Sequence, residues 1–133
     1  EATCQSIGIP TWFYGHEPAC IFSTDIAKYF ANSIREDGII TIAHGGIIYT
    51  PGSAGTMQEI FQDAAQNHYL TDDESAPMIF FDTDYWTNRI PIYKFLQDCM
   101  EIKSYANLRL SLSDDIEEVY AILEEYVKML ESK

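Results

Sequence analysis

The apolar and polar positions of this chain alternate between short continuous apolar runs and longer stretches with helical spacing. A strand covered on both faces needs consecutive apolar residues, whereas a helix buried on one face repeats them every three or four positions. By this criterion, strands are predicted at residues 7–14, 45–51, 76–82 and 108–113. Helices are predicted at residues 57–68, 89–102 and 113–130.

The same spacing predicts which face of a helix is buried. In the first of these helices the predicted stripe is Met57, Ile60, Phe61, Ala64, Ala65 and His68. In the last helix it is Ile116, Val119, Tyr120, Leu123, Val127 and Leu130. The middle helix has Pro91 in its first turn, where the missing N–H costs nothing.

The segment between the first two strands allows more than one interpretation. Residues 23–33 carry apolar residues at helical spacing after two hydroxyl residues that could cap a helix. Residues 33–44 fit two patterns, because their β-branched residues favour a strand while Ser33 and Glu36 form the S-x-x-E capping box of a helix. We prefer the helix for this second stretch.

Strands that alternate with helices indicate an α/β layered domain with a mostly parallel sheet. The length of 133 residues fits one domain. The chain opens at Glu1 without a Met and runs directly into an apolar segment. We therefore expect residues 1–133 to be a fragment or a processed piece.

Charge and cysteine usage narrow the classes of partner. With 21 acidic against 8 basic residues the net charge is −13, which disfavours nucleic acids and anionic membranes as partners. No apolar run approaches membrane-spanning length, and no signal peptide is visible. Cys4, Cys20 and Cys99 are widely spaced, so we expect reduced thiols in a cytoplasmic protein, with no metal site and no disulfide framework.

The corner between the second strand and the first clear helix, "PGSAGTMQE" at residues 51–59, concentrates the residues suited to a ligand. Gly52 and Gly55 allow close approach to the backbone, and the first N–H groups of a helix attract a phosphate. The run matches neither a Walker loop nor a dinucleotide fingerprint. A structural alternative stays open, since Thr56 and Glu59 also form a T-x-x-E capping box.

This nine-residue stretch resembles the P-G-G-x-G-T-x-x-E signature of the Lonely Guy family, whose members are often described as lysine-decarboxylase-like. The family has a Rossmann-like fold and includes cytokinin-riboside-monophosphate phosphoribohydrolases, which hydrolyse the N-glycosidic bond of a nucleoside 5′-monophosphate. The resemblance implies that residues 1–133 form a single Rossmann-like three-layer α/β domain with a mostly parallel sheet, and that they are its carboxyl-terminal half, lacking the amino-terminal part. Ser53 departs from the pattern at the second glycine. The resemblance implies that Gly52, Ser53, Ala54, Gly55 and Thr56 bind the phosphate of a nucleotide such as AMP.

The resemblance also implies two catalytic residues. Glu59 would stabilise the oxocarbenium-like sugar or activate water, as carboxylates do in glycoside hydrolysis. Arg35, which lies 24 residues earlier in "NSIRED", would take the place of the arginine in the family's M-x-x-R-K run. The Met and the Lys of that run are absent here. The scheme requires no cofactor and no metal, and the family's usual homodimer is the expected assembly.

Other interpretations of the same residues remain open. The loop could serve a nucleotide sensor without turnover, or Arg35 could be a solvated arginine in the first turn of a helix. A decarboxylase would need a cofactor lysine, and no Lys lies near the motif. In the expected loop at 82–88, Tyr85 and Trp86 could stack on a base or on a neighbouring subunit.

Overall fold

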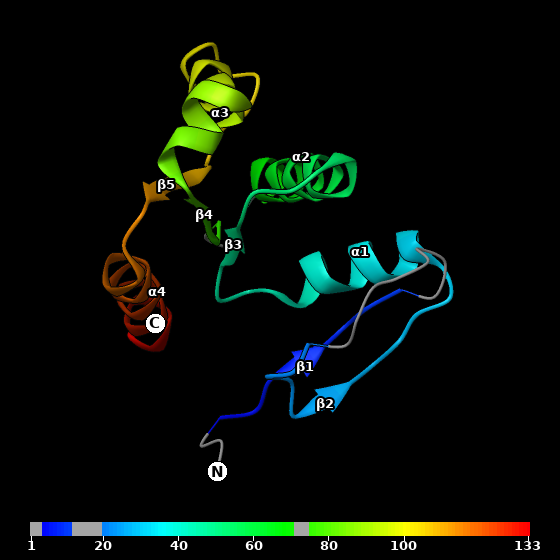
Figure 1. Cartoon of the computed structure of the whole chain (residues 1–133). Coiled ribbons are helices and arrows are strands. Elements are labelled where there is room, and N and C mark those ends of the chain that lie inside the picture. The colour runs from blue at the N-terminus through cyan, green and yellow to red at the C-terminus, as the bar shows by residue number, and fades with distance from the viewer. Residues whose placement is uncertain (1–3, 12–19, 71–74) are drawn as a thin grey trace. The chain divides into compact units, whose positions relative to one another are not determined.

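The computed structural model describes residues 4–11, 20–70 and 75–133 of the chain (Figure 1). Its elements are β1 (Ile7–Gly8), β2 (Asp25–Ile26), α1 (Asn32–Ile42), β3 (Ile47–Tyr49), α2 (Ala54–Tyr69), β4 (Pro77–Phe81), η1 (Tyr85–Arg89), α3 (Ile92–Glu101), β5 (Arg109–Ser113) and α4 (Ile116–Glu131). The chain divides into two compact units, Glu1–Ile42 and Ala43–Lys133, and each is described by itself.

The first unit holds a short parallel pair, β1 and β2, followed by α1. The helix predicted at 23–33 is wrong. Thr24, expected near its start, instead continues the strand pairing: its backbone N–H donates to the Ser6 carbonyl at 2.7 Å, and its hydroxyl donates to the same carbonyl at 2.9 Å. Backbone pairing thus outweighed a helical pattern of apolar residues.

Two further predictions concern this unit, the helix after residue 33 and the strand at residues 7–14. The preference for a helix after residue 33 is confirmed, because α1 covers Asn32–Ile42. Of the strand predicted at 7–14, the described part forms β1 and an isolated bridge from Thr11 to Tyr29. Residues 12–14 lie outside the described residues.

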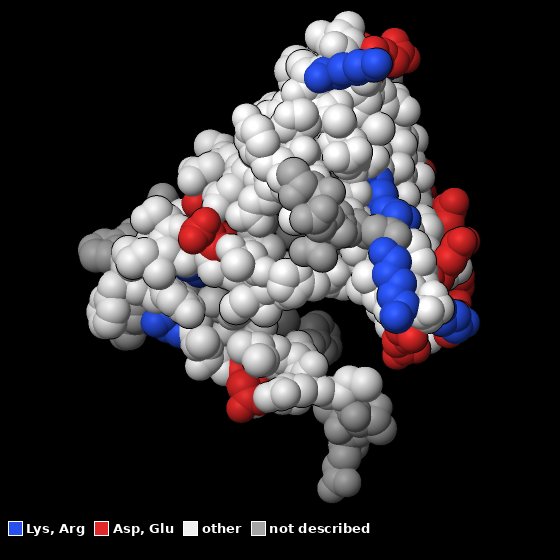
Figure 2. All heavy atoms as spheres, turned by 180° about the vertical axis from the view of Figure 1, so that it is seen from behind, with Lys and Arg blue, Asp and Glu red and all other residues white. Residues whose placement is uncertain are grey.

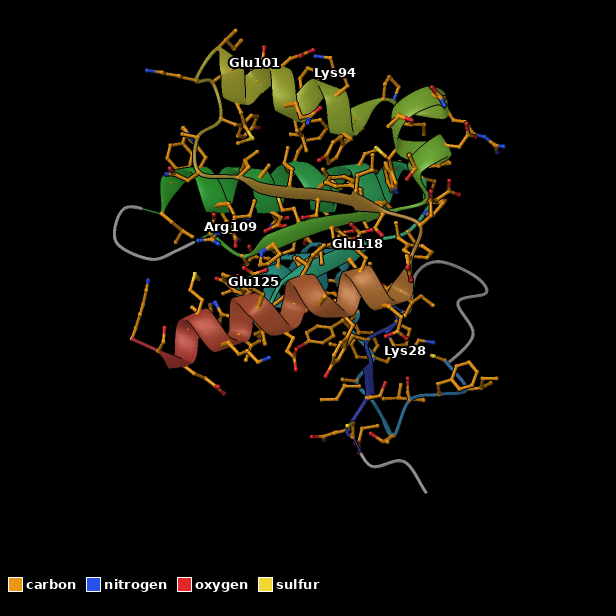
Figure 3. The ribbon with its side chains drawn as sticks, turned by 90° about the vertical axis from the view of Figure 1, so that its left-hand side faces the viewer. Lys28, Lys94, Glu101, Arg109, Glu118 and Glu125 are labelled. Carbon is orange, nitrogen blue, oxygen red and sulfur yellow. The ribbon has the colours of Figure 1, made fainter. Side chains whose placement is uncertain are left out.

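The second unit is built on a three-stranded parallel sheet in the order β3–β4–β5. Figures 1 and 3 show α2 and α3 on one face of this sheet and α4 on the other. Both connections, β3–α2–β4 and β4–α3–β5, therefore place their helices on the same face. The predicted α/β class, with a parallel sheet in a three-layer Rossmann-like arrangement, is confirmed.

The core of this unit lies between the sheet and the α2–α3 layer. Met78 and Phe80 of β4 point to that side and pack with Ile60 and Ala64 of α2 and with Leu96 of α3. All five side chains are fully buried. The apolar stripe predicted for α2 is thus confirmed at its centre, and the strands predicted at 45–51, 76–82 and 108–113 are confirmed as β3, β4 and β5.

The stripe predicted for α4 is only partly correct. Val119 is buried and Leu123 is half-buried, whereas Ile116 and Tyr120 are exposed. Val127 and Leu130 are also exposed, and Tyr126, which the prediction left out, is buried. Because α4 has apolar residues around more than half of its circumference, the helical period alone could not select the face that meets the sheet.

The loop expected at 82–88 is in fact helical. After β4 the chain enters a π-helical turn, η1, closed by the Ile90 N–H donating to the Tyr85 carbonyl at 2.8 Å. Trp86 is fully buried there, and its indole N–H donates to the Phe81 carbonyl at 2.9 Å. Burial of a large aromatic ring with its N–H satisfied explains why this polar-looking segment is ordered.

On the face drawn in Figure 2, most side chains are uncharged, and the Lys and Arg side chains are few. No helix in the part of the chain that the structure describes is long and apolar enough to cross a membrane.

Candidate functional site

The candidate site lies at the carboxyl edge of the three-stranded sheet. Because the strands are parallel, the segments that follow β3, β4 and β5 all leave the sheet at this edge. Figure 3 marks its direction, with Arg109 at the amino end of β5 and Glu118 in the first turn of α4, beyond the strand's carboxyl end. The sequence motif occupies the first of these three segments.

The motif forms a tight turn between β3 and α2. Residues 50–53 connect Tyr49 to the first helical residue, Ala54, and the Met57 N–H donates to the Ser53 carbonyl at 3.1 Å. Gly52 lies directly against the first turn, where a Cβ atom at this position would stand 2.0 Å from the Thr56 hydroxyl oxygen. A side chain at residue 52 is therefore sterically excluded.

The capping box predicted for Thr56 and Glu59 is wrong. The helix begins one turn earlier, with Ser53 as its N-cap residue, so that Thr56 is the third residue of α2. Glu59 then lies in the second turn, too far along for the reciprocal cap. Thr56 is therefore not the N-cap residue of α2, and Ser53 takes that position.

The amino end of α2 has electrostatic features suited to an anion. Within the described residues, the Ser53 side chain makes no capping hydrogen bond, and the first turn of α2 contains no acidic residue. The partial positive charge of the helix end is consequently not offset by a carboxylate of its own. Together with Gly52 and Gly55, this arrangement can accept a phosphate group.

Glu59 is half-buried on α2 and lies near the end of β3. Burial raises the pKa of Tyr49 above its usual range, the adjacent Asp63 carboxylate raises it further, and the charge of Glu59 adds a smaller effect in the same direction. The Glu59 carboxylate is thus close enough to the end of β3 to influence a group there. It lies one helical turn from Asp63 on the same helix.

A buried polar chain, which sequence reasoning missed, supports the helix that carries Glu59. The Tyr49 hydroxyl donates to Asp63 Oδ2 at 2.7 Å, and the Asn67 amide donates to Asp63 Oδ1 at 2.9 Å. The Ala76 N–H in turn donates to Asn67 Oδ1 at 3.0 Å. Burial raises the pKa of Asp63 to about 6, against the lowering effect of these hydrogen bonds. In the sequence, the available signal for these hydrogen bonds was the presence of polar residues at positions 63 and 67 of α2, one turn apart.

In the segment after β4, the Tyr85 side chain contacts the motif turn, whereas the Trp86 side chain does not reach the surface of the site. The Tyr85 hydroxyl donates to the Gly52 carbonyl at 2.5 Å. Trp86 is fully buried, so its predicted stacking on a base is wrong. Asp84 pairs with Arg89 at 3.1 Å and hydrogen-bonds Asn88, whose donation is the larger cause of the lowered pKa of Asp84. Among the described residues, no cluster of three or more His, Cys, Asp or Glu side chains could hold a metal ion.

Arg35 belongs to the first unit and is described within it. Its guanidinium donates to the Ile9 carbonyl at 3.2 Å and lies 3.8 Å from the Glu36 carboxylate. The Arg35 side chain is only 15% exposed, so the solvated alternative is wrong. Within the second unit, a hydrogen bond links Tyr85 to Gly52 of the motif, and Glu59 follows on α2. Arg35 belongs to the first unit, where its partners include Ile9 and Glu36.

Comparison with known proteins adds no identification. No protein-family model matches the chain, and no curated protein gives a significant match to it.

Proposed function

We propose that this protein is a nucleoside 5′-monophosphate phosphoribohydrolase of the Lonely Guy type. The observation that carries the proposal is the position of residues 51–59 at the carboxyl edge of a parallel sheet. At this edge, the turn contains Gly52, where a side chain does not fit, and it leads into α2. The first turn of α2 has no acidic residue, and Glu59 follows one turn later on the same helix. The motif of the resemblance thus has the strand–turn–helix setting that a phosphate cradle requires.

The proposed reaction is hydrolysis of the bond between C1′ of the ribose and the base nitrogen. The amides at residues 53–55 hold the 5′-phosphate, which fixes the ribose relative to the helix. As the C1′–N bond breaks, the Glu59 carboxylate stabilises the positive charge that develops on the sugar. Water adds its oxygen to C1′, one of its protons passes to the base, and the products are free base and ribose 5-phosphate.

The resemblance assigns Arg35 a supporting role in the same proposal. A guanidinium binds phosphate in a fixed fork geometry, or assists the departing base with a hydrogen bond. An acidic residue, Glu36, follows it where the family pattern has a Lys. A homodimer is the assembly that belongs to this proposal, and sedimentation velocity on the purified protein tests it.

The alternative is a nucleotide sensor that uses the same loop without turnover. Ser53 in place of the family's second glycine is the observation that favours it, because a side chain there narrows the approach to the helix end. The sensor and the enzyme differ in one measurable respect, which is release of the base.

The deciding experiment is chromatography of AMP incubated with the wild-type protein and with its Glu59→Gln variant. The enzyme releases adenine and ribose 5-phosphate, while Glu59→Gln abolishes release and retains AMP binding in calorimetry. Tight AMP binding by the wild type without any adenine would instead establish the sensor. A matched control is Glu131→Gln, the same chemical change at the exposed last residue of α4, which is expected to retain base release.

A further inference from the structure

One hydrogen bond links the motif turn to the segment that follows the next strand. The Tyr85 hydroxyl donates to the Gly52 carbonyl at 2.5 Å, between residues 33 positions apart in the chain. Gly52 follows β3 and Tyr85 follows β4, so the bond joins two neighbouring loops at the carboxyl edge of the sheet. Both residues are half-buried, where a hydrogen bond loses less to competition with water.

Tyr85 is itself held firmly by its surroundings. Its backbone N–H donates to Asp82 Oδ1 at 3.0 Å, and its carbonyl accepts from the Ile90 N–H at 2.8 Å. Its ring meets the buried Trp86 ring edge-on, with 4.9 Å between the ring centroids. Asp82 adopts a φ of 88°, unusual for a residue other than glycine, and its N–H donates to the Ser113 carbonyl at 3.3 Å. The hydroxyl that reaches Gly52 is therefore carried by an ordered segment.

The bond fixes more than one oxygen atom, because a peptide group is planar. The Gly52 carbonyl and the Ser53 N–H belong to the same peptide group and point in opposite directions. A peptide that follows a glycine turns over easily, since glycine has no Cβ to oppose the rotation. By holding the Gly52 carbonyl, Tyr85 turns the Ser53 N–H to the other side of the loop, at the start of α2.

We propose that Tyr85 is a positioning residue for phosphate binding: its hydroxyl holds the Gly52–Ser53 peptide so that the Ser53 N–H faces a phosphomonoester. The inference rests on the proposed function in one respect, that the turn receives a phosphate. Tyr85 acts through the backbone of the loop and contributes to the phosphate end of the substrate. Its loss weakens the binding of phosphate-bearing ligands specifically.

The test compares Tyr85→Phe with the wild type by calorimetry, using AMP, adenosine and inorganic phosphate as probes. Phenylalanine keeps the ring against Trp86 and removes only the hydroxyl. Loss of one hydrogen bond that orders a donor predicts roughly fivefold to tenfold weaker binding of AMP and of phosphate. Adenosine, which lacks the phosphate, is expected to bind both proteins equally, a pattern that a general loss of stability would not produce.

Tyr105→Phe is the matched control. Tyr105 also packs against the core of the second unit, but it precedes β5 and so lies toward the amino edge of the sheet. The same chemical change at this position is expected to leave the binding of AMP and phosphate unchanged. If Tyr105→Phe weakened AMP and phosphate as much as Tyr85→Phe does, the proposal would be overturned.

If Tyr85→Phe is less stable than the wild type, a second measurement still tests the role of Tyr85. In the wild type, titration with inorganic phosphate should shift the amide resonance of Ser53 in a nitrogen–proton NMR spectrum. In folded Tyr85→Phe, that shift should shrink at equal phosphate concentration. An undiminished Ser53 shift with unchanged phosphate affinity would overturn the role of Tyr85.

Failure of the inference and failure of the proposed function give different results. A wild type that binds phosphate more tightly than Tyr85→Phe but releases no adenine would contradict the hydrolase and support the role of Tyr85. A wild type that releases adenine with unchanged affinities in Tyr85→Phe would support the hydrolase and contradict the role of Tyr85. Absence of phosphate and AMP binding in the wild type would overturn both.

Discussion

The hydroxyl of Tyr49 donates a 2.7 Å hydrogen bond to the carboxylate of Asp63 inside the second unit. Tyr49 is the last residue of β3, and Asp63 lies in the middle of α2, so the bond spans the motif turn that connects them. Both side chains are buried, being 4% and 5% exposed. The turn between β3 and α2 is thus closed at its base by a polar contact that fixes the helix relative to the strand.

Removal of this contact should lower the stability of the protein. Tyr49→Phe leaves the buried Asp63 carboxylate with one fewer donor, which is expected to reduce the free energy of unfolding by about 1–3 kcal/mol. Urea denaturation measures the change. Tyr120→Phe, at a position 62% exposed on α4, is the control and should be neutral. Equal losses for the two variants would contradict a structural role for the Tyr49–Asp63 bond.

The pH dependence of stability should reveal Asp63. Burial raises the pKa of this carboxyl from 3.8 to about 6, so the native state holds the proton more tightly than the unfolded chain does. The stabilisation that protonated Asp63 provides is complete below about pH 4 and is lost as the pH rises through about 6. Asp63→Asn removes the titrating group. The stability of the wild type relative to Asp63→Asn should therefore fall by roughly 2 kcal/mol between pH 4 and pH 7.

Chemical denaturation at several pH values measures this difference, and the subtraction cancels the other acidic residues common to both proteins. The charged residue near the Tyr49–Asp63 pair is Glu59, whose charge acts on Tyr49 in both proteins. A difference that stays constant from pH 4 to pH 7 would show that Asp63 titrates normally.

Gly52 should not accept even the smallest side chain. A Cβ at this position would stand 2.7 Å from Thr56 Cβ as well as 2.0 Å from its hydroxyl oxygen, and rotation of the Thr56 side chain cannot move its Cβ. Gly52→Ala must shift the backbone of the turn, and we expect a loss of about 1–3 kcal/mol in the free energy of unfolding. Phosphate affinity should fall with it.

Gly45→Ala is the control for this substitution, because a Cβ there meets nothing within 4 Å. Thermal and urea denaturation of the two variants, with phosphate calorimetry, make the comparison. Wild-type stability and phosphate affinity in Gly52→Ala would contradict the steric account of the turn.

Two N-cap residues of the second unit, Asp115 of α4 and Ser53 of α2, should respond differently to alanine. Asp115 accepts a hydrogen bond from the Glu117 N–H at 2.9 Å, so Asp115→Ala should cost about 1 kcal/mol. Ser53 makes no such capping bond within the described residues, so Ser53→Ala should cost clearly less than Asp115→Ala. Urea denaturation distinguishes them. An equal loss for Ser53→Ala would indicate that its hydroxyl caps α2 and would weaken the case for a ligand at the helix end.

Much of the second unit could be predicted from its sequence. The apolar runs that became β3, β4 and β5 and the helical spacing of α2 depend on local periodicity, which a single sequence displays. The position of the motif between a strand and a helix followed from the same patterns. The order of these elements was sufficient to predict a parallel sheet and the edge at which a ligand would bind.

Other features depended on partners distant in the chain. Trp86 became buried because the sheet and α3 surround it, although its neighbours in sequence are polar. Thr24, directly before β2, is held in an extended pairing because Ser6, 18 residues earlier, accepts hydrogen bonds from it. In α4, only packing against the sheet decided that Tyr126 is buried and Tyr120 exposed.

The candidate site divides in the same way. The sequence by itself determined the glycine turn, the helix that follows and the carboxylate at Glu59, because spacing along one segment sets their order. Only the tertiary structure decided that the Tyr85 hydroxyl donates a hydrogen bond to the Gly52 carbonyl and that the Tyr49 hydroxyl donates one to Asp63. It also decided at which residue α2 begins. Hydrogen bonds between separate segments need a folded backbone to bring donor and acceptor within 3 Å of each other, and no periodicity in a linear sequence records that approach.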